Sequence, residues 1–274
     1  MTVNHDDLWS FEGKNVPIHW HNDLEINLIR EGEAVFQVYQ KSYRVRTGEG
    51  FLLNRNVPHS CSSPGNEHVR YSTILVRPDF LYGDFGSDVE RKCFQPFLQN
   101  SAIPCIHLTG FDENGKEILW KLNQVEEAFD RKRFCYELKI KGLLCEAFAM
   151  ILYGHRQELT KFVPANLQEL ERLEKMLNYL NMHFTEVISL QDLADQVHLS
   201  REVCCRLFKK MTGKTITGYL EEYRVNKSFS LVQSGQYSMT QITEMVGFSN
   251  PSRFASAFRK RFGCNPGEYN SVKH

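Results

Sequence analysis

The chain has 274 residues, of which 42% are hydrophobic and 24% charged, and its formal net charge is zero. This length accommodates two domains with hydrophobic cores of their own, and the composition is that of an ordinary globular protein rather than a uniformly basic polyanion binder. The N-terminus has no apolar run of signal-peptide length, and no segment approaches the ~20 apolar residues of a membrane span. We therefore expect a cytoplasmic protein with no membrane partner.

The neutral total hides an asymmetry in charge along the chain. Residues 190–274 contain 12 Lys and Arg but only 7 Asp and Glu, so this end carries a net charge of +5 and the rest is correspondingly acidic. A basic end on a neutral chain favours nucleic acid as a partner.

The eight cysteines include no C-x-x-C pair and no zinc-ligand spacing. We therefore expect reduced thiols without a redox or metal role. The sequence also offers no nucleophile paired with a general base, so we predict no catalytic residues.

Residues 16 to about 108 contain short apolar segments separated by turn-forming residues, and no convincing helical period. Such a pattern predicts a small β-barrel or sandwich. The expected strands are Leu24–Arg30, Ala34–Tyr39, Tyr43–Arg46, Gly50–Asn54, Val69–Val76 and Ile103–His107.

Polar residues with a distinctive spacing stand at the start of this region: Gly13, His19, His21, Glu25 and Gly32 form G-x5-H-x-H-x3-E-x6-G. Two histidines two residues apart on a strand point to the same face, and Trp20 between them points to the other. Three interpretations stay open. His19, His21, Glu25 and His59 suit a divalent transition metal; or they line an effector pocket with Phe36, Tyr39 and Phe51; or the histidines are structural.

After Gly110 the pattern becomes helical, with helices expected over Asn114–Phe129 and Glu137–Leu159. The second helix is apolar over a broad face, which predicts packing on the barrel and on a second subunit. The apolar residues of this stripe are Ile140, Leu143, Leu144, Ala147, Phe148, Ile151 and Leu152. A linker is expected over residues 161–167, and from Gln168 onward the sequence predicts only helices and tight turns.

The last 85 residues contain one pattern twice, at an offset of 49 residues and, after one inserted residue, of 50. Each copy has a short support helix, a turn, an N-cap and a second helix that ends at a glycine, which predicts a helix-turn-helix. The second helices are expected over Arg201–Met211 and Pro251–Phe262, with Ile216–Gln233 as a helix between the units. Two such units on one chain favour binding to successive major-groove segments of DNA.

This stretch resembles the AraC-type family of bacterial transcription regulators, through SLQDLADQVHLS, LFKKMTGKT, YLEEYR and ITEMVGFSNPSRFASAFRKRFGCNPGEY. The resemblance covers about Leu173 to Tyr269. It implies double-stranded DNA and RNA polymerase as partners and, by position, base contacts from Glu202, Cys205, Arg206, Ser252, Arg253 and Ser256. Many family members have an aromatic residue in place of Arg253 and an arginine in place of Ser256. Phosphate contacts are expected from Lys209, Lys210, Arg259, Lys260 and Arg261.

The Gly13–Gly32 spacing also resembles the first motif of the cupin barrel family, whereas the second motif is degraded: Gly48 and His59 fit it, but the expected Pro and Gly between them are replaced. The AraC-type resemblance implies an N-terminal cupin-like barrel that binds a small effector rather than performing chemistry.

We therefore predict an α+β multidomain protein, with a cupin-like β-barrel and flanking helices followed by an all-α double helix-turn-helix. Its parts are an effector-binding barrel over residues 1–110, a helical dimerisation segment over 111–160, the linker, and a DNA-binding domain over 168–274 with units at 189–213 and 238–263. The expected function is that of a homodimeric, sequence-specific transcription regulator, more often an activator, that senses a small molecule such as a sugar. The alternative is a metal-binding cupin enzyme fused to a DNA-binding domain.

Overall fold

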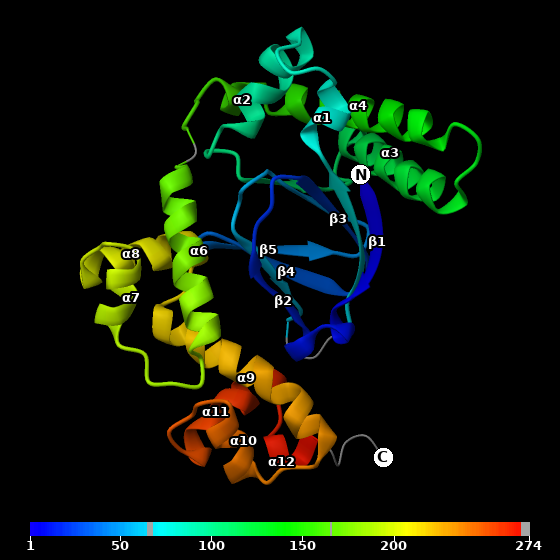
Figure 1. The fold of residues 1–274 in the computed structure, drawn as a ribbon. Helices are drawn as coiled ribbons and strands as arrows, with labels where there is room; N and C mark the ends of the chain where they lie inside the picture. Colours follow the sequence, from blue (N-terminus) through cyan, green and yellow to red (C-terminus); the bar gives the residue numbers. More distant parts are fainter. Residues whose placement is uncertain (65–67, 165, 270–274) are drawn as a thin grey trace.

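The computed structural model describes residues 1–64, 68–164 and 166–269, and these form a sheet-rich N-terminal half and a helical C-terminal half (Figure 1). In the N-terminal half, antiparallel strands make a five-stranded sheet in the order β1-β8-β3-β6-β9 and a four-stranded sheet in the order β2-β7-β4-β5. The strands are β1 Thr2–Asp7, β2 Asn15–His19, β3 Leu24–Glu31, β4 Glu33–Val38, β5 Lys41–Arg46, β6 Gly50–Leu53, β7 His59–Ser62, β8 Arg70–Val76 and β9 Cys105–Leu108.

The N-terminal half thus has the predicted cupin-like fold, as two facing sheets rather than one closed barrel. Each of the six predicted strands is present, with ends shifted by up to two residues. The six predicted strands do not include β1, β2 or β7. The sequence of β7, His-Ser-Cys-Ser, lacks the β-branched and aromatic residues that mark strands, so its extended form depends on pairing with β2 and β4.

Side chains alternate along β3 between two environments. Leu24, Ile26 and Leu28 face outward and join the core beneath the helices, whereas Glu25 and Asn27 point between the two sheets. The helices of this half are α1 Pro78–Tyr82, η3 Glu90–Phe94, α2 Gln95–Leu98, α3 Glu113–Arg131, α4 Tyr136–Gly154 and α5 Arg156–Leu159, after two short 3-10 helices, η1 Leu8–Ser10 and η2 Glu12–Lys14.

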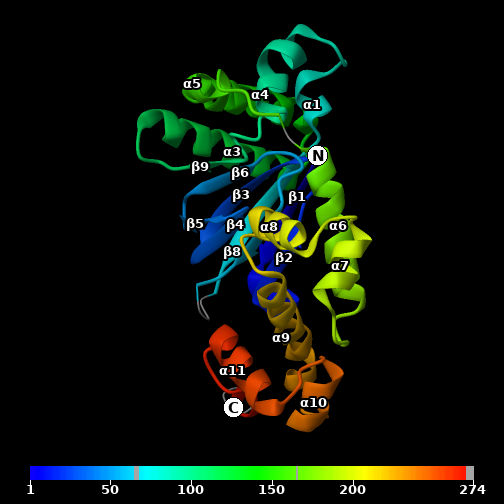
Figure 2. The ribbon, with the colours of Figure 1, turned by 90° about the vertical axis from the view of Figure 1, so that its left-hand side faces the viewer.

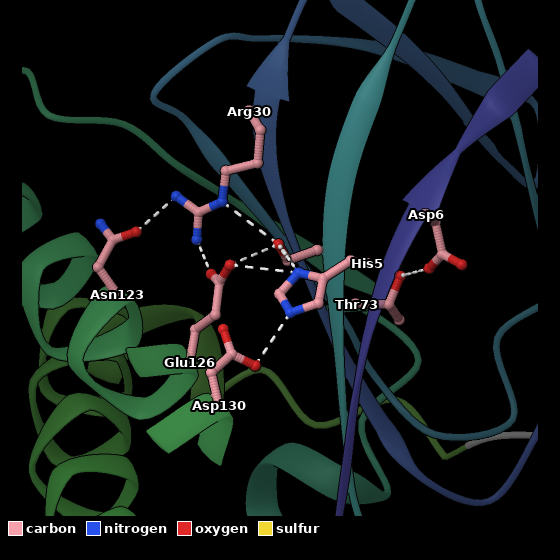
Figure 3. Close-up of polar contacts among 8 residues, drawn as sticks. His5, Asp6, Arg30, Thr73, Asn123, Glu126 and Asp130 are labelled. Atoms are coloured by element: carbon pink, nitrogen blue, oxygen red, sulfur yellow. Dashed lines mark hydrogen bonds and ion pairs between the residues drawn. The ribbon is translucent and has the colours of Figure 1, made fainter. Parts of the chain in front are cut away.

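Polar contacts fasten α3 to the outer face of the five-stranded sheet (Figure 3). Arg30 of β3 pairs with Glu126 and donates to Asn123 Oδ1 at 2.6 Å, while His5 of β1 lies 3.0 Å from Asp130. Asp6, the next residue along β1, points to the opposite side of the sheet. This alternation places one row of polar residues under α3 and another between the sheets.

The apolar stripe expected to meet a second subunit is buried within the chain, so the argument for dimerisation through it was wrong. Leu144 and Ile151 are 0% and 2% exposed. The helix is apolar over a broad face because it packs on α3 and also on the segment of α1 to α2, where Phe94 lies against Phe148. The expected helix Glu137–Leu159 is also broken at His155 into α4 and α5.

The C-terminal half consists of two helix-turn-helix units joined by one long helix, α9 (Figures 1 and 2). The core of the first unit includes the start of α9, and the core of the second unit includes its end, so α9 fixes the separation between the units. The helices are α6 Leu167–Met182, α7 Leu190–Gln196, α8 Arg201–Thr212, α9 Ile216–Ser234, α10 Met239–Met245, α11 Pro251–Phe262 and α12 Pro266–Tyr269.

The predicted caps are formed. Ser200 accepts from the backbone N–H of Val203 at the start of α8, and Asn250 accepts from that of Arg253 at the start of α11. Both recognition helices end at glycines in the left-handed conformation, as expected. The turns differ in one respect: the left-handed position is Gly247 in the second unit but His198, at φ 53°, in the first. Within the described residues, no helix is long and apolar enough to cross a membrane.

The two halves are in direct contact. Ile18 of β2 and Trp20, just beyond the end of this strand, pack on the core of the first helix-turn-helix unit. At Gly213, which ends α8, an added Cβ would lie 2.5 Å from the backbone oxygen of Tyr39, so only glycine permits this approach. Trp20 therefore packs under helices, as the alternation along the strand predicts.

Candidate functional site

The recognition helix of the first unit, α8, presents a polar face to solvent. Glu202 and Arg206 are exposed and Cys205 is half-buried, whereas Cys204, Leu207 and Phe208 fill the core. Of the neighbours Val203 and Cys204, Cys204 is the buried one. The residues predicted to face DNA from this helix therefore share one accessible face.

The second recognition helix, α11, repeats this division. Ser252, Arg253 and Ser256 are exposed, opposite a row of buried phenylalanines at positions 254, 258 and 262. The Arg253 guanidinium lies 3.1 Å from the carboxylate of Glu221 on α9. An exposed pair of this kind contributes little to stability, so Arg253 can exchange Glu221 for another acceptor at low cost.

The five residues predicted to contact phosphates have different surroundings. Lys209, Arg259 and Lys260 are exposed. Lys210 is also exposed but lies 2.6 Å from Glu169 of α6. Arg261 is the exception, because it is half-buried and donates to the backbone oxygen of Gly13 at 2.7 Å. In this arrangement of the two halves, the Arg261 guanidinium is turned to the N-terminal half rather than to solvent.

In the N-terminal half, the predicted histidines and the glutamate come together between the sheets. His19 ends β2, His21 lies in the turn before β3, Glu25 is on β3 and His59 begins β7. Their candidate ligand atoms all lie within 4.8 Å of one another. His21 Nε2 is 2.7 Å from Glu25 Oε2, and His59 Nε2 is 3.4 Å from the same oxygen. We call these four residues the histidine cluster.

The cluster holds a buried anion. Burial alone would raise the pKa of Glu25, but the hydrogen bonds from His21 and Asn27 and the proximity of His59 outweigh it and hold the pKa well below its usual value. The hydrogen bond to Glu25 raises the pKa of His21. Burial and the neighbouring His59 lower the pKa of His19 to about 4. The cluster therefore combines a carboxylate, a strong donor at His21 and a neutral imidazole at His19.

The ring orientations of His19 and His59 also suit a metal. His19 Nδ1 lies 3.0 Å from the oxygen of Pro17, and His59 Nδ1 lies 2.8 Å from that of Val57, so each ring donates through Nδ1. Each then presents a lone pair at Nε2, as in metal-bound histidines held by a backbone carbonyl. His59 Nε2 is buried and has no hydrogen-bond partner. The donor set of three imidazoles and one carboxylate thus fits a divalent transition metal.

The aromatic residues predicted for the pocket separate into two places. Phe36 and Phe51 stack at a centroid distance of 4.7 Å and are fully buried in the core between the sheets. Tyr39 lies at the end of β4, where it lines a cavity of about 680 Å³ together with Lys210 and Met211 of the C-terminal half. Tyr39 is therefore an interdomain residue as well as a neighbour of the sheet core.

Polar residues that were not predicted from the sequence continue from the cluster across the inner face of the five-stranded sheet. Asn27 donates to Glu25 Oε1 at 2.8 Å, and the Thr73 hydroxyl lies 3.2 Å from Asn27 Oδ1 and 2.8 Å from Asp6 Oδ2. Asn27 is completely buried. The sequence did contain a signal for these residues. Asn27 follows Glu25 by two residues on an otherwise apolar strand, so the two side chains must face the same side of the sheet.

Comparison with known proteins agrees with both halves. The family model for the AraC-like ligand-binding domain matches residues 8–104, and a helix-turn-helix domain model matches residues 193–271. The transcriptional activator RhaR of Mannheimia succiniciproducens is 31% identical over 268 residues, which cover 93% of this chain and 87% of the relative. The uncharacterised HTH-type regulator YdeC of Bacillus subtilis is 28% identical over 258 residues, covering 94% of this chain and 87% of the relative.

Among solved structures, ToxT of Vibrio cholerae covers 99% of this chain and 98% of its own, at 16% identity and a TM-score of 0.47. The two sequence relatives carry the names of transcriptional regulators rather than of enzymes. A regulator of this type has an N-terminal ligand-binding domain and a C-terminal DNA-binding helix-turn-helix domain. With the cupin-like sheets, the paired recognition helices and these matches, the chain belongs to the AraC family of transcriptional regulators.

Proposed function

We propose that this regulator reads a specific DNA sequence with α8 and α11 and senses a small polar molecule at the histidine cluster. The observation that carries the sensing part is Glu25, a buried carboxylate whose pKa is held well below its usual value between His21 and Asn27. Enclosed donors and acceptors with fixed positions are what specific recognition of a polar ligand needs.

In the DNA part of the proposal, α8 and α11 enter successive major-groove segments, with α9 setting their separation. Arg206 and Arg253 have the side chains that bind guanine in a bidentate way, and Glu202 can accept from the amino group of cytosine. A hydrogen bond from its own backbone N–H, helped by the Ser200 hydroxyl, lowers the pKa of Glu202, so it is an anion at neutral pH. Cys205, Ser252 and Ser256 complete the base-facing set.

Phosphate contacts are assigned to Lys209, Lys210, Arg259 and Lys260, which are exposed on the same two helices. Such contacts position a protein on DNA without reading its sequence. Arg261 joins this set only if it leaves its contact with Gly13. Because its partner is chromosomal DNA, we place the protein in the cytoplasm, and because relatives named RhaR are activators, we propose activation through RNA polymerase.

For the effector, we favour a ligand rich in hydroxyl groups, such as a sugar. The inner face of the five-stranded sheet carries acceptors and donors at Glu25, Asn27, Thr73 and Asp6. The hydroxyl groups of a sugar both donate and accept, so they match such a row. The test is a thermal-shift screen of the full chain against neutral monosaccharides, since a ligand that binds only the native state raises its stability.

The end of β2 and the turn after it link the two activities in this proposal. His19 and His21 point into the cluster, while Ile18 and Trp20 pack on the first helix-turn-helix unit. A ligand that moves the histidines therefore moves side chains that support α8. Coupling between two sites requires a ligand to interact differently with two states of the protein, and this segment would supply that difference.

We also propose that the protein forms a dimer, but through a different face of α4 from the buried stripe predicted from the sequence. Along α4, Leu138, Gly142, Ala149 and Tyr153 are exposed at helical spacing, on the side away from the chain's own core. Leu138 and Tyr153 are 71% and 68% exposed. We propose that this face of the segment 111–160 packs on a second copy, because small residues between larger apolar ones allow two helices to approach closely.

The histidine cluster also supports a second candidate: a bound divalent metal that forms part of the effector site. The buried, unpartnered His59 Nε2 is the observation that favours it. His19, His21, Glu25 and His59 would hold the metal, which would supply a Lewis acid for binding an oxygen of the effector. Elemental analysis of the purified full chain distinguishes the two candidates, because a metal site of this kind retains close to one metal per chain.

A further inference from the structure

A carboxylate on α9 lies beside the recognition helix of the second unit, which packs against α9 (Figure 1). Glu221 Oε2 accepts from Arg253 Nη2 at 3.1 Å and from Arg253 Nε at 3.3 Å. Both contacts use one edge of the planar guanidinium, the edge formed by Nε and Nη2. Within the part of the chain that the structure describes, Arg253 Nη1 has no hydrogen bond, so the end formed by Nη1 and Nη2 is open to another acceptor.

Arg253 stands where a recognition helix meets the edges of bases. It is the third residue of α11, and its backbone N–H is already bonded to Oδ1 of the N-cap Asn250 at 2.8 Å. The residues near the N-terminus of a recognition helix are those that contact bases in the major groove. The Arg253 side chain is 60% exposed, so the open end of its guanidinium is accessible. Two donors side by side are what a bidentate contact with guanine needs.

The second guanidinium near this pair is committed elsewhere. Arg224, one turn along α9 from Glu221, donates to the backbone oxygen of Phe184 at 2.6 Å and to that of Glu186 at 2.7 Å. Burial and the neighbouring Arg253 lower the pKa of Arg224. All three charged side chains line one cavity of about 500 Å³ between the two units. This space gives the Arg253 side chain room for other rotamers, and its contact with Glu221 favours one of them.

We propose that Glu221 is a positioning residue, which holds the Arg253 guanidinium for an end-on contact with guanine and so sets how strictly α11 reads that base. The inference rests on the DNA binding described above and adds a residue outside the two recognition helices that determines specificity. A side chain that is already oriented loses less conformational freedom when it binds. The pair is too exposed to add much to stability, so its effect is on orientation rather than on folding.

The carboxylate should also limit contacts that carry no sequence information. An unpaired arginine in a DNA groove can turn to the nearest phosphate, which positions a protein without reading bases. Glu221 repels phosphates and keeps Arg253 on the inner side of the groove. Removal of this charge therefore has two separable effects: binding to all sequences becomes tighter, and the preference for guanine at one position becomes weaker.

Glu221→Ala tests the proposal, with Glu222→Ala as the matched control. Glu222 is the next residue of α9 and has a similar side-chain exposure, 31% against 33%, but it pairs with Lys214 instead of Arg253. The probes are a duplex selected by the wild-type full chain from a random-sequence pool and the single-base variants of that duplex. Glu221→Ala should lower the preference for guanine at one position about threefold to tenfold, the cost of ordering a long side chain on binding. Glu222→Ala should change the affinity for all these duplexes by the same factor.

A double-mutant cycle assigns this effect to the arginine. Arg253→Ala should abolish the preference for guanine at that same position. In the Arg253→Ala background, Glu221→Ala should change the affinities for the selected and the substituted duplex equally, because no guanidinium is left to position. The base position read by Arg206 of α8 is the internal control, and its preference should be the same in every variant.

Two outcomes overturn the proposal in different ways. Equal base preference in the wild type, Glu221→Ala and Glu222→Ala, with the preference still lost in Arg253→Ala, overturns positioning by Glu221 and leaves base reading by Arg253 intact. Full preference at every position in Arg253→Ala means that Arg253 reads no base, which overturns its assigned contact and the inference together. The absence of binding to any duplex by the wild type overturns the DNA-binding function itself.

Discussion

Trp20 and His21 are neighbours in the chain whose side chains serve different halves of the molecule. His21 lies 2.7 Å from Glu25 in the histidine cluster, whereas Trp20 packs on the core of the first helix-turn-helix unit. A single peptide unit therefore separates a side chain of the cluster from one that supports α8.

Trp20→Ala should separate sensing from DNA binding. The expected result is that a monosaccharide found in the thermal-shift screen still stabilises the protein but no longer changes its affinity for DNA, because the contact between the halves is lost. Trp120→Ala is the matched control, since this tryptophan is 56% exposed on α3. Fluorescence anisotropy with labelled duplex, with and without ligand, makes the measurement. An unchanged ligand response in Trp20→Ala contradicts coupling through this strand.

Binding of the full chain to DNA should depend steeply on salt. About six to eight phosphate contacts per protomer give a slope of log affinity against log salt of about −5 to −7. Lys260→Ala should lower the affinity for all sequences alike and reduce the magnitude of that slope by about one. Titrations over a range of salt concentrations test this, and a flat response in the wild type would contradict a basic groove-binding surface.

Arg206→Ala should act on sequence preference instead. Arg206 is exposed on α8, and loss of a bidentate contact to guanine costs about 1–3 kcal/mol at the selected site. Preference at one base position should relax, which selection from randomised duplexes measures. A uniform loss across all sequences would place Arg206 on the DNA backbone.

The sequence predicted those features that depend on local geometry. The N-cap at Ser200, the terminal glycine at 213 and the gathering of His21 and Glu25 in one site all follow from spacing along the chain. Features that depend on distant partners could not be predicted. The partner of Arg261 is Gly13, 248 residues away in the chain, and the burial of Leu144 depends on how α1, α2 and α3 surround α4.

The two faces of α4 should respond differently to substitution. Leu144→Ala creates a cavity in the core and should lower the free energy of unfolding by about 2–5 kcal/mol. Leu138→Glu leaves the core intact and should yield a stable monomer, because it places charge in the proposed contact with a second copy. Chemical denaturation and analytical ultracentrifugation measure the two effects. A folded Leu138→Glu protein that still dimerises would move the interface to another surface, such as a sheet edge.

Glu25→Gln tests the sensing site. The substitution keeps the shape of the side chain but removes the charge that His21 and His59 face, and Gln can no longer accept through both oxygens. A buried donor left without its partner costs about 1–3 kcal/mol, so ligand binding and the ligand response should be lost or sharply reduced while DNA affinity without ligand is retained. Glu31→Gln is the control, on the same strand but with its side chain 57% exposed.

Calorimetry with the screened monosaccharide and elemental analysis are run on both variants. If Glu25→Gln keeps the ligand response but loses a metal that the wild type retains, the cluster is a metal site. If neither changes, the four residues are structural and the effector binds elsewhere, with the cavity beside Tyr39 as the next place to examine.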